Sequence, residues 1–140
     1  MTAPAPTGPD YGYNLRLDGV KLPEARERIT AALKEEGFGI LTEIDVAATL
    51  KTKLDVTFRP YVILGACNPQ LAHRALGAEL GVGLLLPCNV CVWEDDGGAV
   101  ISIAKPEALF EIVGRHDVQP VAEEAGQRLR RALDRVTQPG

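Results

Sequence analysis

Residues 89–103 read NVCVWEDDGGAVISI, two apolar runs separated by the dipeptide Asp96-Gly97. An Asp-Gly pair between two such runs is the strongest short-range signal for a β-hairpin. With this dipeptide at the centre of the turn, the expected cross-strand pairs are Trp93–Val100, Val92–Ile101 and Val90–Ile103. The segment therefore predicts two antiparallel strands, around which the rest of the chain is interpreted.

Strand and helix patterns alternate on both sides of this hairpin. A polar–apolar period of two is typical of a half-buried strand, and apolar stripes at helical spacing indicate amphipathic helices. Asp45, Asn68 and Asp117 are each placed to cap a helix. The further predicted strands are 11–17, 38–44, 60–66 and 82–86, and the predicted helices are 23–37, 45–54, 68–80, 106–114 and 117–136.

This order of elements predicts one α/β (α+β) domain over residues 10–136. A chain of 140 residues is long enough to bury one core. The expected architecture is a two-layer sandwich, in which a mostly antiparallel or mixed sheet carries helices on one face. The proline-rich residues 1–9 are predicted to be a disordered lead-in, and residues 137–140 a frayed tail.

The composition disfavours nucleic acid and membranes as partners. Acidic side chains outnumber basic ones by 19 to 15, whereas proteins that bind nucleic acid usually carry a basic surplus. The longest apolar run, residues 82–93, is interrupted by Pro87 and Asn89. It is shorter than the roughly 20 residues that cross a bilayer.

Cysteine usage points to a reducing compartment. The three cysteines are an odd number at uneven spacing, which is unlike the disulfide framework of a secreted domain. The first ten residues, MTAPAPTGPD, show neither the basic flank nor the apolar stretch of a signal peptide. The cytoplasm is therefore the expected location.

Two short phrases, ACNP at residues 66–69 and PCN at residues 87–89, are the candidate functional site. Cys67 lies where a predicted strand meets the N-terminus of a predicted helix, whose unpaired N–H groups favour an anion or a thiolate. If the strand that follows Cys88 is antiparallel to the strand before Cys67, both thiols lie at one end of the sheet. Asn68 and Asn89 would flank them, and His73 lies on the same helix as Asn68.

Alternative interpretations of these residues stay open. Buried cysteines often only pack against the core. A zinc site could use Cys67, His73, Cys88 and Cys91. Against the CxxC pattern of Cys88 and Cys91, cysteines three apart on an extended strand point to opposite faces, about 10 Å from each other.

Several longer phrases resemble a prokaryotic family, domain-of-unknown-function family 302. They are GFGILTEIDV at 37–46, TLK at 49–51, FRPY at 58–61, ILGACNP at 63–69, AH at 72–73 and GLLLPCNV at 83–90. The resemblance extends over residues 11–136 and implies a two-layer α/β fold, similar to half of a TATA-binding-protein-like saddle and often homodimeric. Five residues match the recurring phrases of the family, whereas Cys91 does not: Cys67, Asn68, His73, Cys88 and Asn89.

The leading functional hypothesis is a binding module for a small anion or a thiol-reactive ligand. Cys67, Asn68, His73, Cys88 and Asn89 would form the ligand site, and no cofactor or resident metal is expected. One alternative is an enzyme or sulfur carrier that uses Cys67 as its nucleophile. A third is a structural homodimer, in which the sheet face with Cys91 and Trp93 packs against a second copy.

Overall fold

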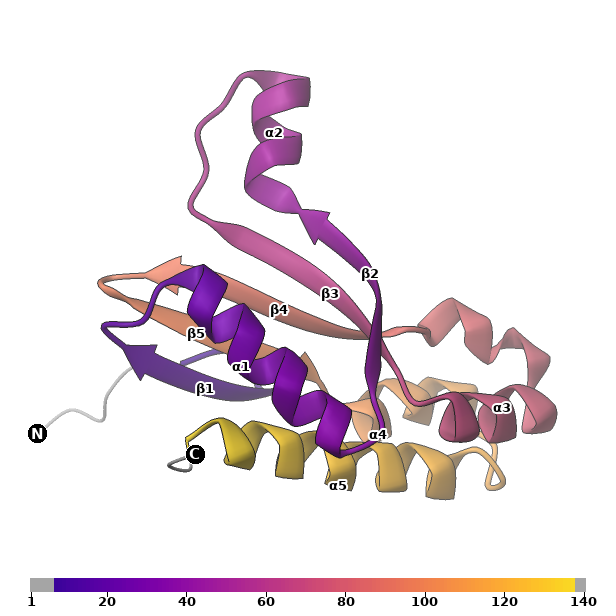
Figure 1. The fold of residues 1–140 in the computed structure, drawn as a ribbon. Helices are drawn as coiled ribbons and strands as arrows, with labels where there is room; N and C mark the ends of the chain where they lie inside the picture. Colours follow the sequence, from indigo (N-terminus) through magenta and orange to yellow (C-terminus); the bar gives the residue numbers. More distant parts are fainter. Residues whose placement is uncertain (1–6, 138–140) are drawn as a thin grey trace, which may run out of the picture.

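Five antiparallel strands form one open sheet in the computed structural model, which describes residues 7–137 (Figure 1). In the spatial order β1-β5-β4-β3-β2, the strands are β1 (Gly12–Asp18), β5 (Gly98–Ala104), β4 (Cys88–Asp95), β3 (Tyr61–Cys67) and β2 (Gly39–Asp45). The helices are α1 (Leu22–Glu35), α2 (Val46–Leu54), α3 (Pro69–Ala78), α4 (Pro106–Leu109) and α5 (Gln119–Val136), with 3-10 helices η1 (Leu80–Leu85) and η2 (Phe110–Val113). The two-layer α/β prediction is confirmed.

The predicted hairpin is confirmed in position and in register. β4 and β5 pair so that Val90 faces Ile103, Val92 faces Ile101 and Trp93 faces Val100. The turn residues Asp96 and Gly97 have φ values of 51° and 82°, which is the backbone that a two-residue turn of type I′ requires. The hairpin supplies two of the three inner strands of the sheet, because β5 also pairs with β1 and β4 with β3.

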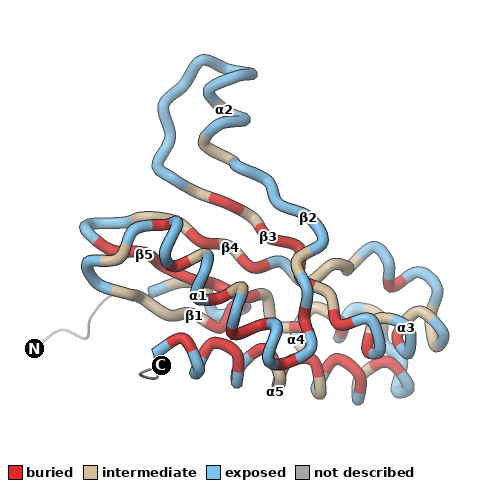
Figure 2. The backbone as a smooth tube through the Cα atoms, viewed as in Figure 1, coloured by how far each residue is buried: buried red, intermediate tan, exposed pale blue. Residues whose placement is uncertain are grey.

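The helices α1 and α5 cover one face of the sheet and form the core with it (Figure 2). Alternate side chains of β3 and β4 point into this layer and are buried: Val62, Leu64, Val90 and Val92. The stripe predicted on the last helix is buried in the same core: Val121, Ala125, Leu129, Leu133 and Val136. The opposite face, called the open face here, carries the half-buried residues Tyr61, Ile63, Cys91 and Trp93.

Two of the three predicted helix caps are confirmed. The Asp45 carboxylate accepts a hydrogen bond from the Ala48 N–H at 2.9 Å. The Asn68 side chain caps α3 in the same way. The Asp117 cap is wrong, because α5 begins after Val118 and no side chain caps it. The Asp117 carboxylate instead accepts hydrogen bonds from Arg115 at 2.9 and 3.0 Å.

The predicted strand over residues 82–86 is also wrong, because this segment forms the 3-10 helix η1. An apolar run with no alternation does not distinguish a buried strand from a helical turn. Here the Glu79 carboxylate accepts a hydrogen bond from the Gly81 N–H at 3.2 Å and starts the turn. Leu80 and Leu84 point outward and are 82% and 92% exposed.

One part of the chain projects from the rest of the molecule, away from α5 (Figure 1). This arm, residues 41–60, comprises most of β2, all of α2 and the extended segment that leads into β3. None of its residues is buried. Within the arm, the helix capped by Asp45 forms where the sequence predicts it.

Some predictions fall at the edges of the described chain. Residues 1–6 of the predicted lead-in and 138–140 of the predicted tail lie outside the described residues. Within residues 7–137, no helix has both the length and the apolar character needed to cross a bilayer.

Candidate functional site

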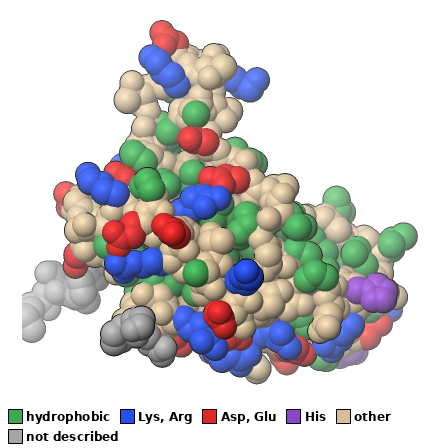
Figure 3. Space-filling model, in the orientation of Figure 1, with side chains coloured by type: hydrophobic (Ala, Val, Ile, Leu, Met, Phe, Trp, Pro, Cys, Tyr) green, Lys and Arg blue, Asp and Glu red, His purple; other side chains and the backbone are tan. Residues whose placement is uncertain are grey.

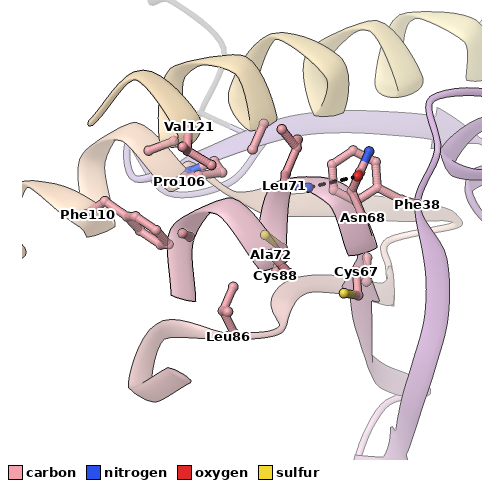
Figure 4. A pocket seen from close by; sticks show the side chains of 14 residues that line it. Phe38, Cys67, Asn68, Leu71, Ala72, Leu86, Cys88, Pro106, Phe110 and Val121 are labelled. Carbon is pink, nitrogen blue, oxygen red and sulfur yellow. Dashed lines mark hydrogen bonds between the residues drawn. The ribbon is translucent and has the colours of Figure 1, made fainter. Parts of the chain in front are cut away.

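A small cavity lies at the end of the sheet where β3 gives way to α3 (Figure 4). Its volume is about 30 Å³. Cys67, Asn68 and Cys88 line it, so the structure brings together three of the five residues that the sequence singled out. The other lining residues are apolar: Phe38, Ala66, Leu71, Ala72, Ala75, Leu86, Pro106, Phe110, Val121, Ala122 and Ala125.

Asn68 fixes the strand-to-helix junction at which the cavity forms. Its side-chain oxygen accepts a hydrogen bond from the Leu71 N–H at 3.2 Å, which satisfies one of the unpaired donors of the first turn. Its amide nitrogen donates to the Glu36 carbonyl oxygen at 3.5 Å. Pro69, at the start of α3, needs no hydrogen-bond partner for its nitrogen. Asn68 is buried, so its main role is to hold this junction.

The two cavity cysteines come from neighbouring antiparallel strands, as the sequence hypothesis required. Cys88 lies opposite Ala66 in the β3–β4 register, and Cys67 is the next residue along β3. Burial, and then the nearby Cys67 side chain, raise the pKa of Cys88 to about 11. The Cys88 thiol is therefore protonated and neutral at physiological pH.

The remaining two predicted site residues lie outside the cavity. His73 is exposed on α3 and is absent from the cavity lining. Asn89 is exposed and faces Gly65 across the β3–β4 pair. Because successive strand residues point to opposite faces, Asn89 points away from the side to which Cys88 points.

Residues 13–136 match the family described as "Domain of unknown function DUF302". The chain belongs to the DUF302 family. A crystal structure of an uncharacterized conserved DUF302 protein from Bacillus stearothermophilus is similar, with 34% sequence identity and a TM-score of 0.83. The similarity covers 91% of this chain and 98% of that one. No curated protein matches the chain.

In this DUF302 chain, the third cysteine lies apart from the other two. Cys91 belongs to the open face, where burial raises its pKa and a hydrogen bond with Tyr61 lowers it. Cys88 and Cys91 thus fail to converge as a CxxC metal motif does. Among residues 7–137, no group of three or more His, Cys, Asp or Glu side chains is arranged to hold a metal ion.

The apolar wall of the cavity is the part that sequence reasoning missed. It is assembled from β3, α3, α4, α5, η2 and the residues that precede β2 and β4, and these segments are spread along the chain. Phe38 and Phe110 are both buried. In the sequence, each of them looks like an ordinary core residue, and nothing nearby indicates that it lines a cavity. The one available signal was the hydrophobic stripe of the last helix, because Val121 and Ala125 belong to both the stripe and the cavity.

Proposed function

We propose that this DUF302 protein is a binding module that captures a small thiol-reactive ligand at Cys67, in the cavity shared with Cys88. The observation that carries the proposal is the presence of two free thiols in one small cavity at the start of α3. Asn68 holds the junction between β3 and α3 in place. The Cys67 sulfur forms the bond to the ligand. The Cys88 thiol, with its pKa of about 11, stands beside it as a neutral group.

The cavity lining favours a neutral, electrophilic ligand over a free anion. No lysine or arginine is among the lining residues, and Asn68 already uses its side-chain oxygen on α3. An anion placed among these apolar groups would lose its hydration without gaining a cationic partner. A ligand that forms a bond to sulfur needs no such partner.

The size of the cavity limits what it can hold. A volume of about 30 Å³ has room for only one or two water-sized groups. The ligand, or the part of it that enters, is therefore a group of very few heavy atoms. Larger ligands would have to place the rest of their bulk outside the cavity mouth.

One equivalent of methyl methanethiosulfonate tests this assignment. The reagent transfers a methylthio group to a thiolate and releases methanesulfinate. We expect native mass spectrometry to show one added group and peptide mapping to place it on Cys67, because burial raises the pKa of both Cys88 and Cys91. The same instrument can detect any adduct that the freshly purified protein already carries and that a reductant removes.

Two single-cysteine variants complete that experiment. Cys67→Ser should lose the label, and Cys91→Ser, a matched change on the open face, should keep it. Labelling that falls mainly on Cys91, or that is spread evenly over the three thiols, would contradict the proposal.

As a second candidate function, we propose that the protein is a structural homodimer in which the open faces of two copies pack together. Tyr61 and Trp93 stack on this face, with ring centroids 5.3 Å apart and an interplanar angle of 9°. Half-buried aromatic side chains at the surface are enriched at protein–protein interfaces. The Trp93→Asp variant should therefore sediment as a monomer under conditions where the wild type is a dimer. An unchanged mass would count against the interface.

We also place the protein in the cytoplasm. Cys67, Cys88 and Cys91 are all free thiols. Reduced thiols persist in the cytosol, where glutathione and thioredoxin keep them from pairing.

A further inference from the structure

One buried carboxylate oxygen has no hydrogen-bond partner in the described part of the chain. It is Oε2 of Glu107, a residue of α4 that directly follows the cavity residue Pro106. By contrast, Glu124 on α5 pairs with Arg128 at the surface, where acidic and basic side chains gather along this helix (Figure 3). A buried polar atom without a partner is rare in folded proteins and calls for a structural explanation.

The other oxygen of Glu107 ties α4 to the sheet. Oε1 accepts a hydrogen bond from the hydroxyl of Tyr13, which lies on the edge strand β1. The Arg130 guanidinium of α5 donates to the same hydroxyl at 3.4 Å and lies 5.0 Å from the centre of the Tyr13 ring. Burial, and then the hydrogen bond to Glu107, raise the pKa of Tyr13 to about 12. The phenol is therefore protonated and remains a donor at physiological pH.

Gly126 on α5 leaves the room that this carboxylate occupies. A Cβ atom at position 126 would lie 2.1 Å from Oε2 of Glu107 and 2.7 Å from the hydroxyl oxygen of Tyr13. Glycine within a helix is less stable than alanine, so this position sacrifices helix stability for space. The preceding residue, Ala125, lines the cavity, which places the carboxylate next to the cavity wall.

The contact adjoins the wall that α4 and η2 contribute to the cavity, through Pro106 and Phe110 (Figure 4). α4 has only four residues and no side-chain cap, so its position depends on tertiary contacts. Glu107 supplies two of them: its carboxylate accepts from Tyr13, and its carbonyl oxygen accepts from the Gln119 side chain at 3.3 Å. The position of the wall therefore depends on Glu107.

We propose that the Glu107 carboxylate is a positioning residue that limits the size of the group accepted at Cys67. This inference rests on the proposed function, capture of a ligand by Cys67, and names what selects the ligand. While Tyr13 and Gly126 hold the carboxylate, the wall formed by α4 and η2 stays close to α5 and the cavity stays small. Without this contact the wall moves outward and a larger group enters. Glu107 does not line the cavity, so it acts only through the wall.

Two methanethiosulfonates of different size test this role on the full chain. The methyl reagent transfers a methylthio group, and the phenyl reagent carries its ring on the sulfur that is transferred. Peptide mapping gives the rate at Cys67 for each reagent, divided by the rate in the urea-unfolded chain. We expect the wild type to react about tenfold more slowly with the phenyl reagent, because an oversized group strains a packed cavity.

Four variants separate the carboxylate from a general loss of packing. Glu107→Ala removes the contact and Gly126→Ala displaces the carboxylate, so each should reduce the methyl-to-phenyl ratio at least about threefold. Glu107→Gln keeps an oxygen that accepts from Tyr13 and should keep the wild-type ratio. Glu111→Ala is the matched control, because it makes the same change at an exposed residue of η2, and it should also keep that ratio.

The outcomes distinguish this inference from the proposed function. Methyl labelling that avoids Cys67 in the wild type would overturn both. Labelling of Cys67 with one ratio in the wild type and in both alanine variants of the contact would leave the proposed function standing and overturn the role of Glu107. A ratio that falls as far in Glu107→Gln would also overturn it, because the hydrogen bond would then not position the wall. Cys88 monitors folding: a variant in which it reacts as fast as in urea is replaced by Tyr13→Phe, which removes only the donor and should lower the ratio.

Discussion

Truncating Leu129 to alanine is expected to lower the free energy of unfolding by about 2–5 kcal/mol. Leu129 lies on α5 with an exposed fraction of 0%, inside the core that α1 and α5 form on the sheet. Removal of its side chain takes away apolar contacts and leaves a space that the close-packed surroundings fill only in part. An effect of this size would be a large fraction of the stability of a domain of this length.

Leu84→Ala provides a control with the same chemical change. Leu84 lies on η1 with 92% of its surface exposed, so its truncation should change the free energy of unfolding by less than about 0.5 kcal/mol. Urea denaturation followed by circular dichroism measures both variants against the wild type. A similar, small loss for the two leucines would mean that α5 does not pack on the sheet as the structure has it.

Leu129 also illustrates why much of this fold could be predicted from the sequence. It belongs to an apolar stripe at helical spacing, and such a stripe on a helix must face a core. The hairpin at Asp96-Gly97 was equally accessible, because two turn residues and the alternation on either side determine the register. Local signals of this kind located β4, β5 and α5.

The errors arose where a short-range polar contact overrides the pattern of apolar and capping residues. Residues 82–86 are apolar enough for a strand, yet Glu79 starts a 3-10 turn there and Leu84 points outward. Asp117 has the side chain of a helix cap, but Arg115 holds its carboxylate. In both cases one polar contact with a neighbouring residue determines the local conformation, and sequence periodicity does not register it.

The candidate site, like the fold, could be predicted from the sequence only in part. Cys67, Asn68 and Cys88 could be grouped from the sequence, because an antiparallel β3–β4 pair brings the end of one strand to the start of the other. The apolar wall, the exclusion of His73 and Asn89 from the cavity, and the uncovered arm depend on how distant segments pack. The exposed side chains of Leu54 and Val56 in particular resemble core residues when read in sequence alone.

The reactivity of Cys88 provides the second large expected effect. Burial is the main cause that raises its pKa from 9.0 to about 11. At pH 8 a thiol shifted upward by two units has about 100-fold less thiolate, and the thiolate is the form that reacts. Alkylation of Cys88 by iodoacetamide in the folded protein should therefore be about 100-fold slower than in the urea-unfolded chain at pH 8.

The pH profile of the alkylation shows whether Cys88 reacts slowly because its pKa is raised or because the reagent cannot reach it. Poor access lowers the alkylation rate by the same factor at every pH, whereas a raised pKa moves the midpoint of the profile. We expect peptide mapping to give a midpoint near 11 for Cys88 in the folded protein, and the Cys67→Ser variant should keep most of the shift because burial is its larger cause. A midpoint near 9 would mean that Cys88 forms a thiolate as readily as an exposed cysteine, and the assignment of ligand capture to Cys67 would lose its main support. A midpoint near 11 leaves Cys67 as the cavity thiol that must react first.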